Sequence, residues 1–199
     1  MEWKMWQVVF IILGYLCGSI PSAYLIGKTR GIDIRKVGDG NVGAANAYQQ
    51  IGHWAGLAVI VADVIKGVIP MLLVAIFSDN LLVIFLTGIA AMLGHILPMF
   101  LGFKGGRGES TACGVLVVLL PQPVLILLAI AISPVLITRN TMLLGTIMFA
   151  PLWLLALIFG YSIPLVIYSA FIPAMVGVAH FFTTRKLSPE VRARGKYLK

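Results

Sequence analysis

The sequence predicts an all-α polytopic membrane protein with about seven transmembrane helices, and three observations support this fold class. Of the 199 residues, 60% are hydrophobic and only 11% are charged, a composition that does not suit a soluble domain. The apolar residues fall in runs that can cross about 30 Å of hydrocarbon as helices. Basic residues gather in the segments between alternate runs. We therefore expect a single integral membrane domain over residues 1–199.

The first half of the chain contains three predicted spans. Residues 6–27 form the first, with a bend at Pro21, because proline frees a backbone carbonyl and disturbs the helix. Residues 28–52 are polar and rich in glycine and asparagine, so we expect a loop there. The next two spans, residues 53–77 and 81–101, are separated by only three residues. Such a short connection predicts an antiparallel pair of helices.

The second half is interrupted more often by proline. Residues 112–120 are apolar for only about nine residues before the segment Pro-Gln-Pro at 121–123, which is too short to cross alone. We expect this span to begin deeper, near Glu109 or Ser110. The remaining predicted spans are residues 124–138, 142–159 and 164–182.

The distribution of positive charge predicts how the chain is oriented. If the N-terminus lies outside, all but two of the 15 lysine and arginine residues fall on the inner side, the exceptions being Lys4 and Lys66. Cytoplasmic segments of membrane proteins carry an excess of these residues. The sequence therefore predicts an outer N-terminus, a cytoplasmic C-terminus and an odd number of crossings.

The net charge of +8 needs no nucleic-acid partner. Topology and anionic lipid head groups account for it, and the basic residues are not interleaved with aromatic ones as on a nucleic-acid surface. We expect bilayer lipids as partners instead. Cys17 and Cys113 both lie in apolar surroundings and are predicted to be packed thiols, without a disulfide or a bound metal.

One charged, glycine-dense segment between two apolar runs is the first candidate site, and we call residues 103–108 the glycine loop. Glycine lacks a Cβ, so its backbone can adopt positive φ and bring N–H groups close to a ligand. Ser110 and Thr111 follow where the next helix would begin, so helix-terminal N–H groups and hydroxyls could join the same anion site. The predicted phosphate-binding residues of this segment are Lys104, Gly105, Gly106, Arg107, Gly108 and Thr111.

A second candidate lies in the predicted loop after the first span, and we call residues 38–46 the asparagine loop. It holds three glycines together with Asn41 and Asn46, and the basic pair Arg35 and Lys36 precedes it. Such residues form tight turns and backbone concavities that bind anions. An ordinary solvated connector is the alternative, although a connector seldom needs so many residues.

Four further polar residues are supporting candidates. Asp63 and Lys66 are three apart in a predicted span and can face one another, either as a structural ion pair or to orient the glycine loop. His95 lies near the end of a span and suits a packing role as well as a functional one. His180 precedes the basic tail that contains Lys186, and such tails are commonly solvated charge near lipid.

Together these segments resemble the PlsY family, the bacterial acyl-phosphate:glycerol-3-phosphate acyltransferases. The resemblance covers nearly the whole chain and agrees in the order and spacing of the motifs. The segments that carry it are residues 18–21 (GSIP), 38–46 (GDGNVGAAN), 63–67 (DVIKG), 94–98 (GHILP) and 103–108 (FKGGRG).

The resemblance implies an enzyme of the bacterial cytoplasmic (inner) membrane with its active site on the cytoplasmic face. It would move an acyl chain from acyl phosphate to the 1-hydroxyl of glycerol 3-phosphate, giving lysophosphatidic acid and phosphate. The glycine loop and Arg35 would hold phosphate, while Asn41, Asn46 and His180 would orient the acceptor or the carbonyl. No cofactor or metal is expected, and substrate phosphate could itself take the proton.

The chain departs from the family's usual pattern in ways that change the local charge. Family members usually carry serine at Asp39, arginine at Gln49 and an apolar residue at Glu109, and only His180 and Lys186 remain of the third motif. These departures predict weaker phosphate binding or a different ligand, unless Asp39 pairs with Arg35 or Lys36 and Glu109 turns away. Two alternatives stay open: an inactive homologue serving as a lipid-holding or structural subunit of a membrane complex, and a transporter.

Overall fold

A computed structural model of the chain describes residues 5–138, 140–185 and 187. Over these residues the elements are α-helices, together with two short 3-10 helices at Ile34–Lys36 and Met99–Leu101. The α-helices are α1 (Met5–Gly18), α2 (Ser22–Thr29), α3 (Ala44–Gln50), α4 (His53–Phe77), α5 (Leu81–Ile96), α6 (Glu109–Leu119), α7 (Pro121–Thr138), α8 (Thr141–Phe149), α9 (Leu152–Ile158) and α10 (Ile163–Thr184).

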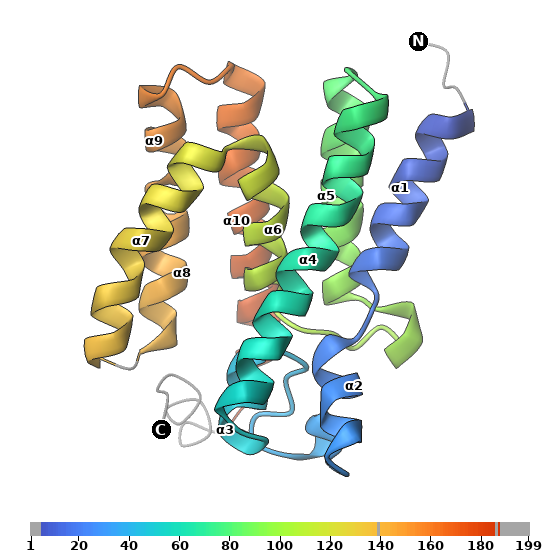
Figure 1. Ribbon diagram of the computed structural model, residues 1–199, viewed down its shortest axis with the longest axis vertical. Coiled ribbons are helices and arrows are strands. Elements are labelled where there is room, and N and C mark those ends of the chain that lie inside the picture. The colour runs from blue at the N-terminus through green and yellow to red at the C-terminus, as the bar shows by residue number, and fades with distance from the viewer. Residues whose placement is uncertain (1–4, 139, 186, 188–199) are drawn as a thin grey trace.

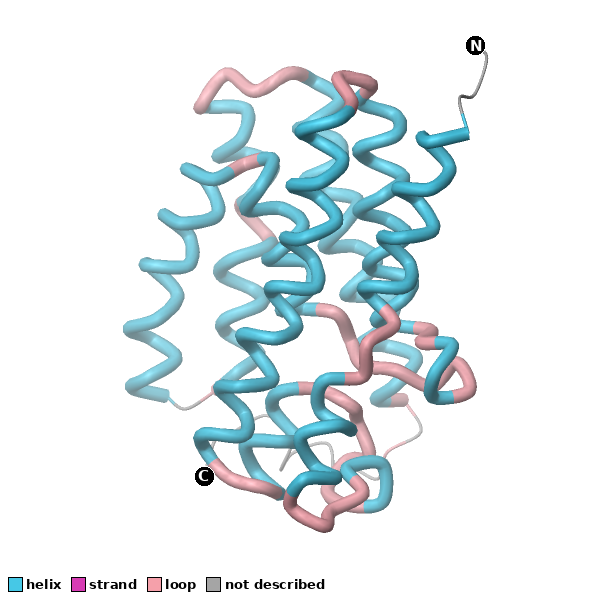
Figure 2. The backbone as a smooth tube through the Cα atoms, turned by 45° about the vertical axis from the view of Figure 1, so that its right-hand side comes forward, coloured by secondary structure: helices cyan, strands magenta, loops and turns pink. Residues whose placement is uncertain are grey.

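The long helices stand side by side in a bundle (Figure 1). Helices α1, α4 and α5 form one side, α7, α8 and α9 form the other, and α6 and α10 lie between them. Most loops lie at the two ends of the bundle (Figure 2). Helix α1 begins at the end opposite to the one at which α10 stops, and α2 and α3 lie at this second end (Figure 1).

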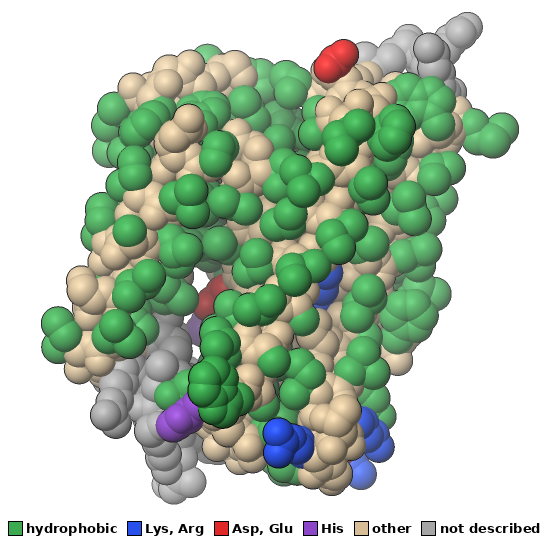
Figure 3. Space-filling view, in the orientation of Figure 1, with side chains coloured by type: hydrophobic (Ala, Val, Ile, Leu, Met, Phe, Trp, Pro, Cys, Tyr) green, Lys and Arg blue, Asp and Glu red, His purple; other side chains and the backbone are tan. Residues whose placement is uncertain are grey.

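The outside of the bundle is apolar, as a surface in contact with lipid would be. Large hydrophobic side chains remain exposed along the helices, for example Trp54 at 81% and Ile137 at 82%. Figure 3 shows hydrophobic side chains over the sides, while most visible lysines and arginines gather at the end that carries α2 and α3. Five helical stretches in the described chain have the length and composition to cross a membrane: Met5–Thr29, His53–Phe77, Leu81–Leu101, Pro121–Thr138 and Ile163–Thr184.

Several predicted boundaries are confirmed. The first span breaks between α1 and α2, next to Pro21, as its proline predicts. Helix α4 has the predicted limits, and it is joined to α5 by the short loop at residues 78–80. Helix α6 begins at Glu109, the deeper start that its short apolar run requires. Cys17 and Cys113 are both free thiols, as expected.

Two predicted elements are wrong. Residues 142–159 are not one continuous helix, because Pro151 separates α8 from α9. Proline has no N–H to donate and its ring clashes with the preceding turn, whereas it is well tolerated where a helix starts. Residues 28–52 are not all loop either, since α3 forms there and packs against α4.

Glycine allows the closest helix contacts. A Cβ at Gly14 would lie 2.6 Å from the carbonyl oxygen of Thr87, and one at Gly18 would overlap the carbonyl of Ala91. Small residues four apart thus let α1 approach the backbone of α5, as is common between membrane helices. Beyond the main core, a second apolar cluster fixes the asparagine loop against α2 and α4; its buried members are Ala23, Ile34, Val42, Ala47, Val59 and Leu101.

Candidate active site

The glycine loop folds back onto the end of α5. The N–H group of Gly105 donates to the carbonyl of Ile96 at 3.1 Å, and that of Gly106 donates to the carbonyl of His95 at 3.2 Å. A Cβ on Gly105 would overlap the His95 carbonyl oxygen, and one on Gly106 would overlap the His95 ring. The prediction that both N–H groups face a phosphate is therefore wrong. Glycine is required at both positions because the loop packs closely against the end of α5, where there is no room for a side chain.

The last glycine of the loop leads directly into α6. Gly108 has a φ of +90°, in the left-handed region that favours glycine, and Glu109 begins the helix. The structure gives the N–H group of Gly108 no hydrogen-bond partner among the described residues. Thr111 is fully buried and its hydroxyl shares a 3.1 Å hydrogen bond with His95 Nδ1. Thr111 thus supports the loop from inside and does not line an open anion site, contrary to the prediction.

Charged groups lie inside the bundle beneath this loop. Lys66 Nζ lies 2.8 Å from Asp63 Oδ1, so the predicted pairing within α4 is confirmed. Lys66 also donates to the carbonyl of Ile20, which lies at the break between α1 and α2, at 2.9 Å. The other Asp63 oxygen lies 4.0 Å from His95 Nδ1. A buried polar cluster therefore connects α4, the α1–α2 break and the histidine against which the glycine loop packs.

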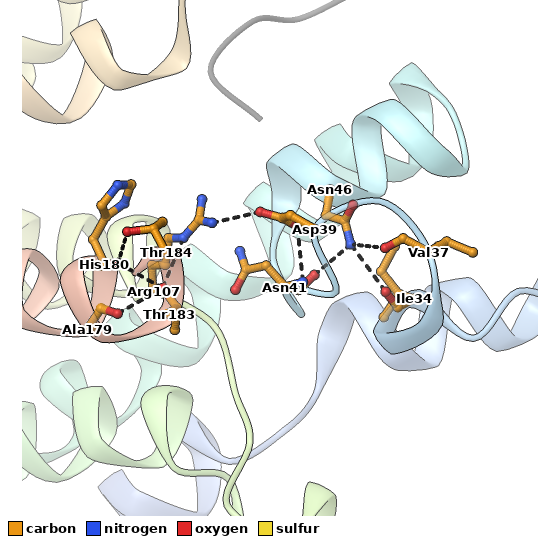
Figure 4. A network of polar contacts seen from close by, with 10 residues as sticks. All are labelled: Ile34, Val37, Asp39, Asn41, Asn46, Arg107, Ala179, His180, Thr183 and Thr184. Carbon is orange, nitrogen blue, oxygen red and sulfur yellow. Dashed lines mark hydrogen bonds and ion pairs between the residues drawn. The ribbon is translucent and has the colours of Figure 1, made fainter. Parts of the chain in front are cut away.

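The asparagine loop is held together by one of its own side chains (Figure 4). Asn46 is buried, and its Nδ2 atom donates to the carbonyls of Ile34, Val37 and Asn41 at 3.0–3.2 Å. Asn46 therefore shapes the loop from within. Asn41 differs, because its Oδ1 atom is buried and has no hydrogen-bond partner among the described residues. Such an acceptor is costly to leave unpaired, so it is suited to receive a hydrogen bond from a ligand.

Arg107 joins three segments that are far apart in the sequence (Figure 4). Its Nη2 atom donates to Asp39 Oδ2 in the asparagine loop at 2.7 Å, and its Nε atom donates to Thr183 on α10 at 3.3 Å. The glycine loop and the asparagine loop are thereby in direct contact. Asp39 pairs with Arg107 and not with Arg35 or Lys36. His180 and the asparagines Asn41 and Asn46 lie on either side of Arg107.

Other predicted phosphate ligands lie elsewhere. Arg35 forms an ion pair with Asp33 at 2.8 Å and lies over the ring of Tyr24, so it is turned toward its own segment. Hydrogen bonds from Arg35 hold the pKa of Asp33 down to about 2. Lys104 is exposed and has no ion pair or hydrogen bond to the described residues. Lys186 lies outside the described residues.

An apolar groove of about 610 Å³ runs between α5 and α10 and ends at the glycine loop. Its polar end is formed by Lys104, Gly105 and Thr183, and its walls are aliphatic and aromatic. The wall residues are Leu93, Ile96, Leu97, Phe103, Phe171, Ala174, Met175, Val178, Ala179 and Phe182. The groove can accept a hydrocarbon chain whose polar end lies at Lys104.

Glu109 turns away from this groove into a second cavity of about 520 Å³ on the other side of α10. His180 and Trp153 line the same cavity. A hollow with an acidic side chain inside it is visible in Figure 3. The carboxylate of Glu109 is thus kept off the Lys104 end of the groove, as phosphate binding would require.

Neither the groove nor the hydrogen bond between Arg107 and Thr183 was predicted from the sequence. The groove positions on α10, Phe171, Met175, Val178 and Phe182, recur at intervals of three or four residues. This spacing places them on one face of a helix. Within a uniformly apolar span, however, nothing separates a groove wall from a face in contact with lipid.

Comparisons with known proteins agree with this geometry. The glycerol-3-phosphate acyltransferase family profile matches residues 8–188. Glycerol-3-phosphate acyltransferase 4 of Dehalococcoides mccartyi is 41% identical over 180 residues, which cover 90% of this chain and 97% of that protein. A glycerol-3-phosphate acyltransferase of Endomicrobium trichonymphae is 37% identical over 182 residues, covering 91% and 92%.

Two crystal structures of PlsY (YgiH), an integral membrane glycerol 3-phosphate acyltransferase, share the fold. Its glycerol 3-phosphate form superposes with a TM-score of 0.84 at 30% identity and covers 97% of this chain and 95% of that one. Its lysophosphatidic acid form gives 0.81 at 29% identity, covering 96% and 94%. With the apolar spans, these matches identify a multi-pass membrane protein. The chain belongs to the glycerol-3-phosphate acyltransferase family.

Proposed function

We propose that this protein transfers an acyl chain from acyl phosphate to glycerol 3-phosphate, giving lysophosphatidic acid and phosphate. The observation that carries the proposal is the apolar groove, in which Lys104, at the polar end, is the only charged wall residue among those that the structure describes. An acyl phosphate has the same division, with a long hydrocarbon chain on an anionic head. Family membership and the resemblance to PlsY in its two ligand-bound forms support the same activity.

The two loops would position the reacting groups. Lys104, the remaining Nη1 atom of Arg107 and the N–H group of Gly108 would bind phosphate oxygens, because charged donors make the stronger hydrogen bonds to anions. The unpaired Oδ1 of Asn41 would accept a hydrogen bond from the glycerol moiety. His180 lines the second cavity and not the groove, so a role at the head of the acyl donor would require its ring to turn toward Arg107.

The reaction depends mainly on how the two substrates are positioned, because acyl phosphate is already activated. The 1-hydroxyl oxygen of glycerol 3-phosphate attacks the acyl carbon, the bond between that carbon and the phosphate oxygen breaks, and phosphate leaves. The hydroxyl proton passes to the departing phosphate. Holding the reactants in this geometry and stabilising the negative charge on the carbonyl oxygen supply the catalysis.

Replacing Lys104 by alanine is expected to lower kcat/KM by roughly 10²- to 10³-fold, since it removes the cation at the polar end of the groove. Purified protein would be given acyl phosphate and glycerol 3-phosphate, and phosphate release would be measured. Lys28→Ala, an exposed lysine outside both loops, serves as the matched control. Wild-type turnover no higher than that of Lys104→Ala would reject the activity, and recovery in a stoichiometric complex would then favour the structural-subunit alternative.

Narrowing the groove is expected to change the choice of acyl chain. Val178 is 56% exposed on the groove wall. In Val178→Trp, kcat/KM for a long acyl phosphate should fall roughly tenfold relative to a short one, because displaced methylenes each lose about 0.8 kcal/mol of burial. Val8→Trp adds the same ring on the exposed side of α1 and should leave the ratio unchanged. An equal effect of both substitutions would show that this groove does not hold the chain.

We also propose seven crossings, with the N-terminus outside and the C-terminus in the cytoplasm of a bacterium whose inner membrane holds the protein. The five long spans, the shorter helix α6, the apolar stretch Leu143–Ile158 that α8 and α9 share, and the opposite ends at which α1 begins and α10 stops support this arrangement. With Cys17 and Cys113 replaced, single cysteines at positions 79 and 104 should react with an impermeant thiol reagent from opposite sides. Labelling of both from one side would reject this topology.

A further inference from the structure

We propose that Asp39 is an internal competitor of substrate phosphate for Arg107. Its carboxylate binds Nη2 of the guanidinium, beside the edge that a phosphate would use, and a bound phosphate displaces it. This inference rests on the proposed function, since it concerns the same site. It assigns to Asp39 the control of how tightly the phosphate substrate binds.

The geometry of the pair carries the first step. Arg107 Nη2 and Asp39 Oδ2 are 2.7 Å apart, and their side chains are only 13% and 8% exposed. Nε is held by Thr183, so Nη1 is the one guanidinium nitrogen without a partner among the described residues. Arginine binds phosphate best through two parallel N–H groups. Nη2 carries two N–H groups, so a phosphate on the Nη1–Nη2 edge would lie directly beside the Asp39 carboxylate, and the repulsion between the two anions favours displacement of Asp39.

Asp39 can leave without undoing its own loop. Its other oxygen, Oδ1, accepts a hydrogen bond from the N–H group of Asn41 at 3.0 Å, and this contact lies within the asparagine loop. The loop is further held by the three hydrogen bonds of Asn46. Rotation of the Asp39 carboxylate away from Arg107 therefore breaks one ion pair, while the other hydrogen bonds keep the conformation of the asparagine loop.

Charge decides the direction of the competition. Asp39 brings one negative charge to Arg107, whereas a phosphate monoester brings nearly two and additional acceptor oxygens. Phosphate at sufficient concentration therefore displaces Asp39 from Arg107. Its apparent affinity is lower than it would be without Asp39, because the Asp39–Arg107 ion pair must first be broken. Because Arg107 also links the asparagine loop to the glycine loop, phosphate binding would release this link while the contact with Thr183 on α10 persists.

Asp39→Asn is the test, because it removes the charge and keeps the size of the side chain. We expect KM for the phosphate substrate that meets Arg107 to fall roughly five- to tenfold, as loss of an ion pair worth about 1 kcal/mol or slightly more predicts. Separate titrations of glycerol 3-phosphate and of acyl phosphate tell which substrate this is. Asp79→Asn removes the same charge at the far end of the bundle and should leave both KM values unchanged. An unchanged or higher KM for both substrates in Asp39→Asn would overturn the proposal.

A binding measurement separates this inference from the proposed activity. Inorganic phosphate should raise the unfolding midpoint of Asp39→Asn at a lower concentration than it does for the wild type, whether or not either protein turns over substrate. Absence of wild-type turnover would reject the activity, while this shift would still test the competition. If Asp39→Asn does not fold, Asp39→Ser is used in its place, because serine keeps an acceptor for the Asn41 N–H group. Failure of both variants to fold would make Asp39 a structural link and overturn the proposal.

Discussion

Replacing Lys66 by methionine is expected to lower the free energy of unfolding by about 3–5 kcal/mol, the usual cost of leaving one member of a buried ion pair without its partner. The side chains of Lys66 and Asp63 are only 6% and 3% exposed, and their charged atoms are 2.8 Å apart. The substitution also removes one of the two hydrogen bonds that the carbonyl of Ile20 accepts, the other coming from the N–H group of Ser22. Reversible unfolding in mixed micelles would measure the loss.

The matched variants for this prediction remove the partner or move the change to the surface. In Lys66→Met with Asp63→Asn, no unpaired charge remains, so much of the lost stability should return. Lys36→Met removes a lysine that is exposed beside the asparagine loop, and it should change stability little. If the double variant were no more stable than Lys66→Met alone, the ion pair would not be the source of the effect.

Replacing Gly105 by alanine is expected to reduce turnover by roughly 10²-fold or more, because a shift of about 1 Å in a positioned group can cost that much. The added Cβ would overlap the carbonyl oxygen of His95 and lie 2.5 Å from Pro98 Cδ. Neither can turn aside as a flexible side chain would, so the loop itself must move and take Lys104 with it. Phosphate release per folded molecule measures the effect.

Gly177→Ala is the control for the glycine substitution. Gly177 lies within α10, and a Cβ built on it meets no atom within 4 Å. Alanine there should preserve both folding and turnover, since alanine is the better helix former. Wild-type turnover in Gly105→Ala would show that the close contact with α5 does not position the site.

The fold was largely predictable because apolar runs and prolines act locally. The limits of α4, the break at Pro21 and the start of α6 at Glu109 all follow from run length and from proline chemistry. The predicted span over residues 142–159 is divided into α8 and α9 because Pro151 interrupts the helix, although the run remains apolar through it. Helix α3 was missed because it has only seven residues, mixes alanine with polar residues and depends on packing against α4.

The site was predictable in its location but not in its contacts. The glycine loop and the asparagine loop, both recognised from their residues, meet in the structure, yet the hydrogen bonds of Gly105 and Gly106 to the end of α5 could not be predicted from the number of glycines. The same holds for Arg107, whose partners Asp39 and Thr183 are 68 and 76 residues away. Sequence patterns tell which residues can bind an anion, whereas tertiary contacts decide which of them are already occupied.

The hydrogen bond from Lys66 to Ile20 also constrains the order in which the protein can assemble. The carbonyl lies where the first span is broken, and its donor is 46 residues further along the chain. While the ribosome is still making α4, this carbonyl accepts only the 3.1 Å hydrogen bond from the N–H group of Ser22, and its charged donor has not yet been made. The first span therefore cannot reach its final hydrogen bonding during its own insertion and must wait for α4 to enter the bilayer beside it.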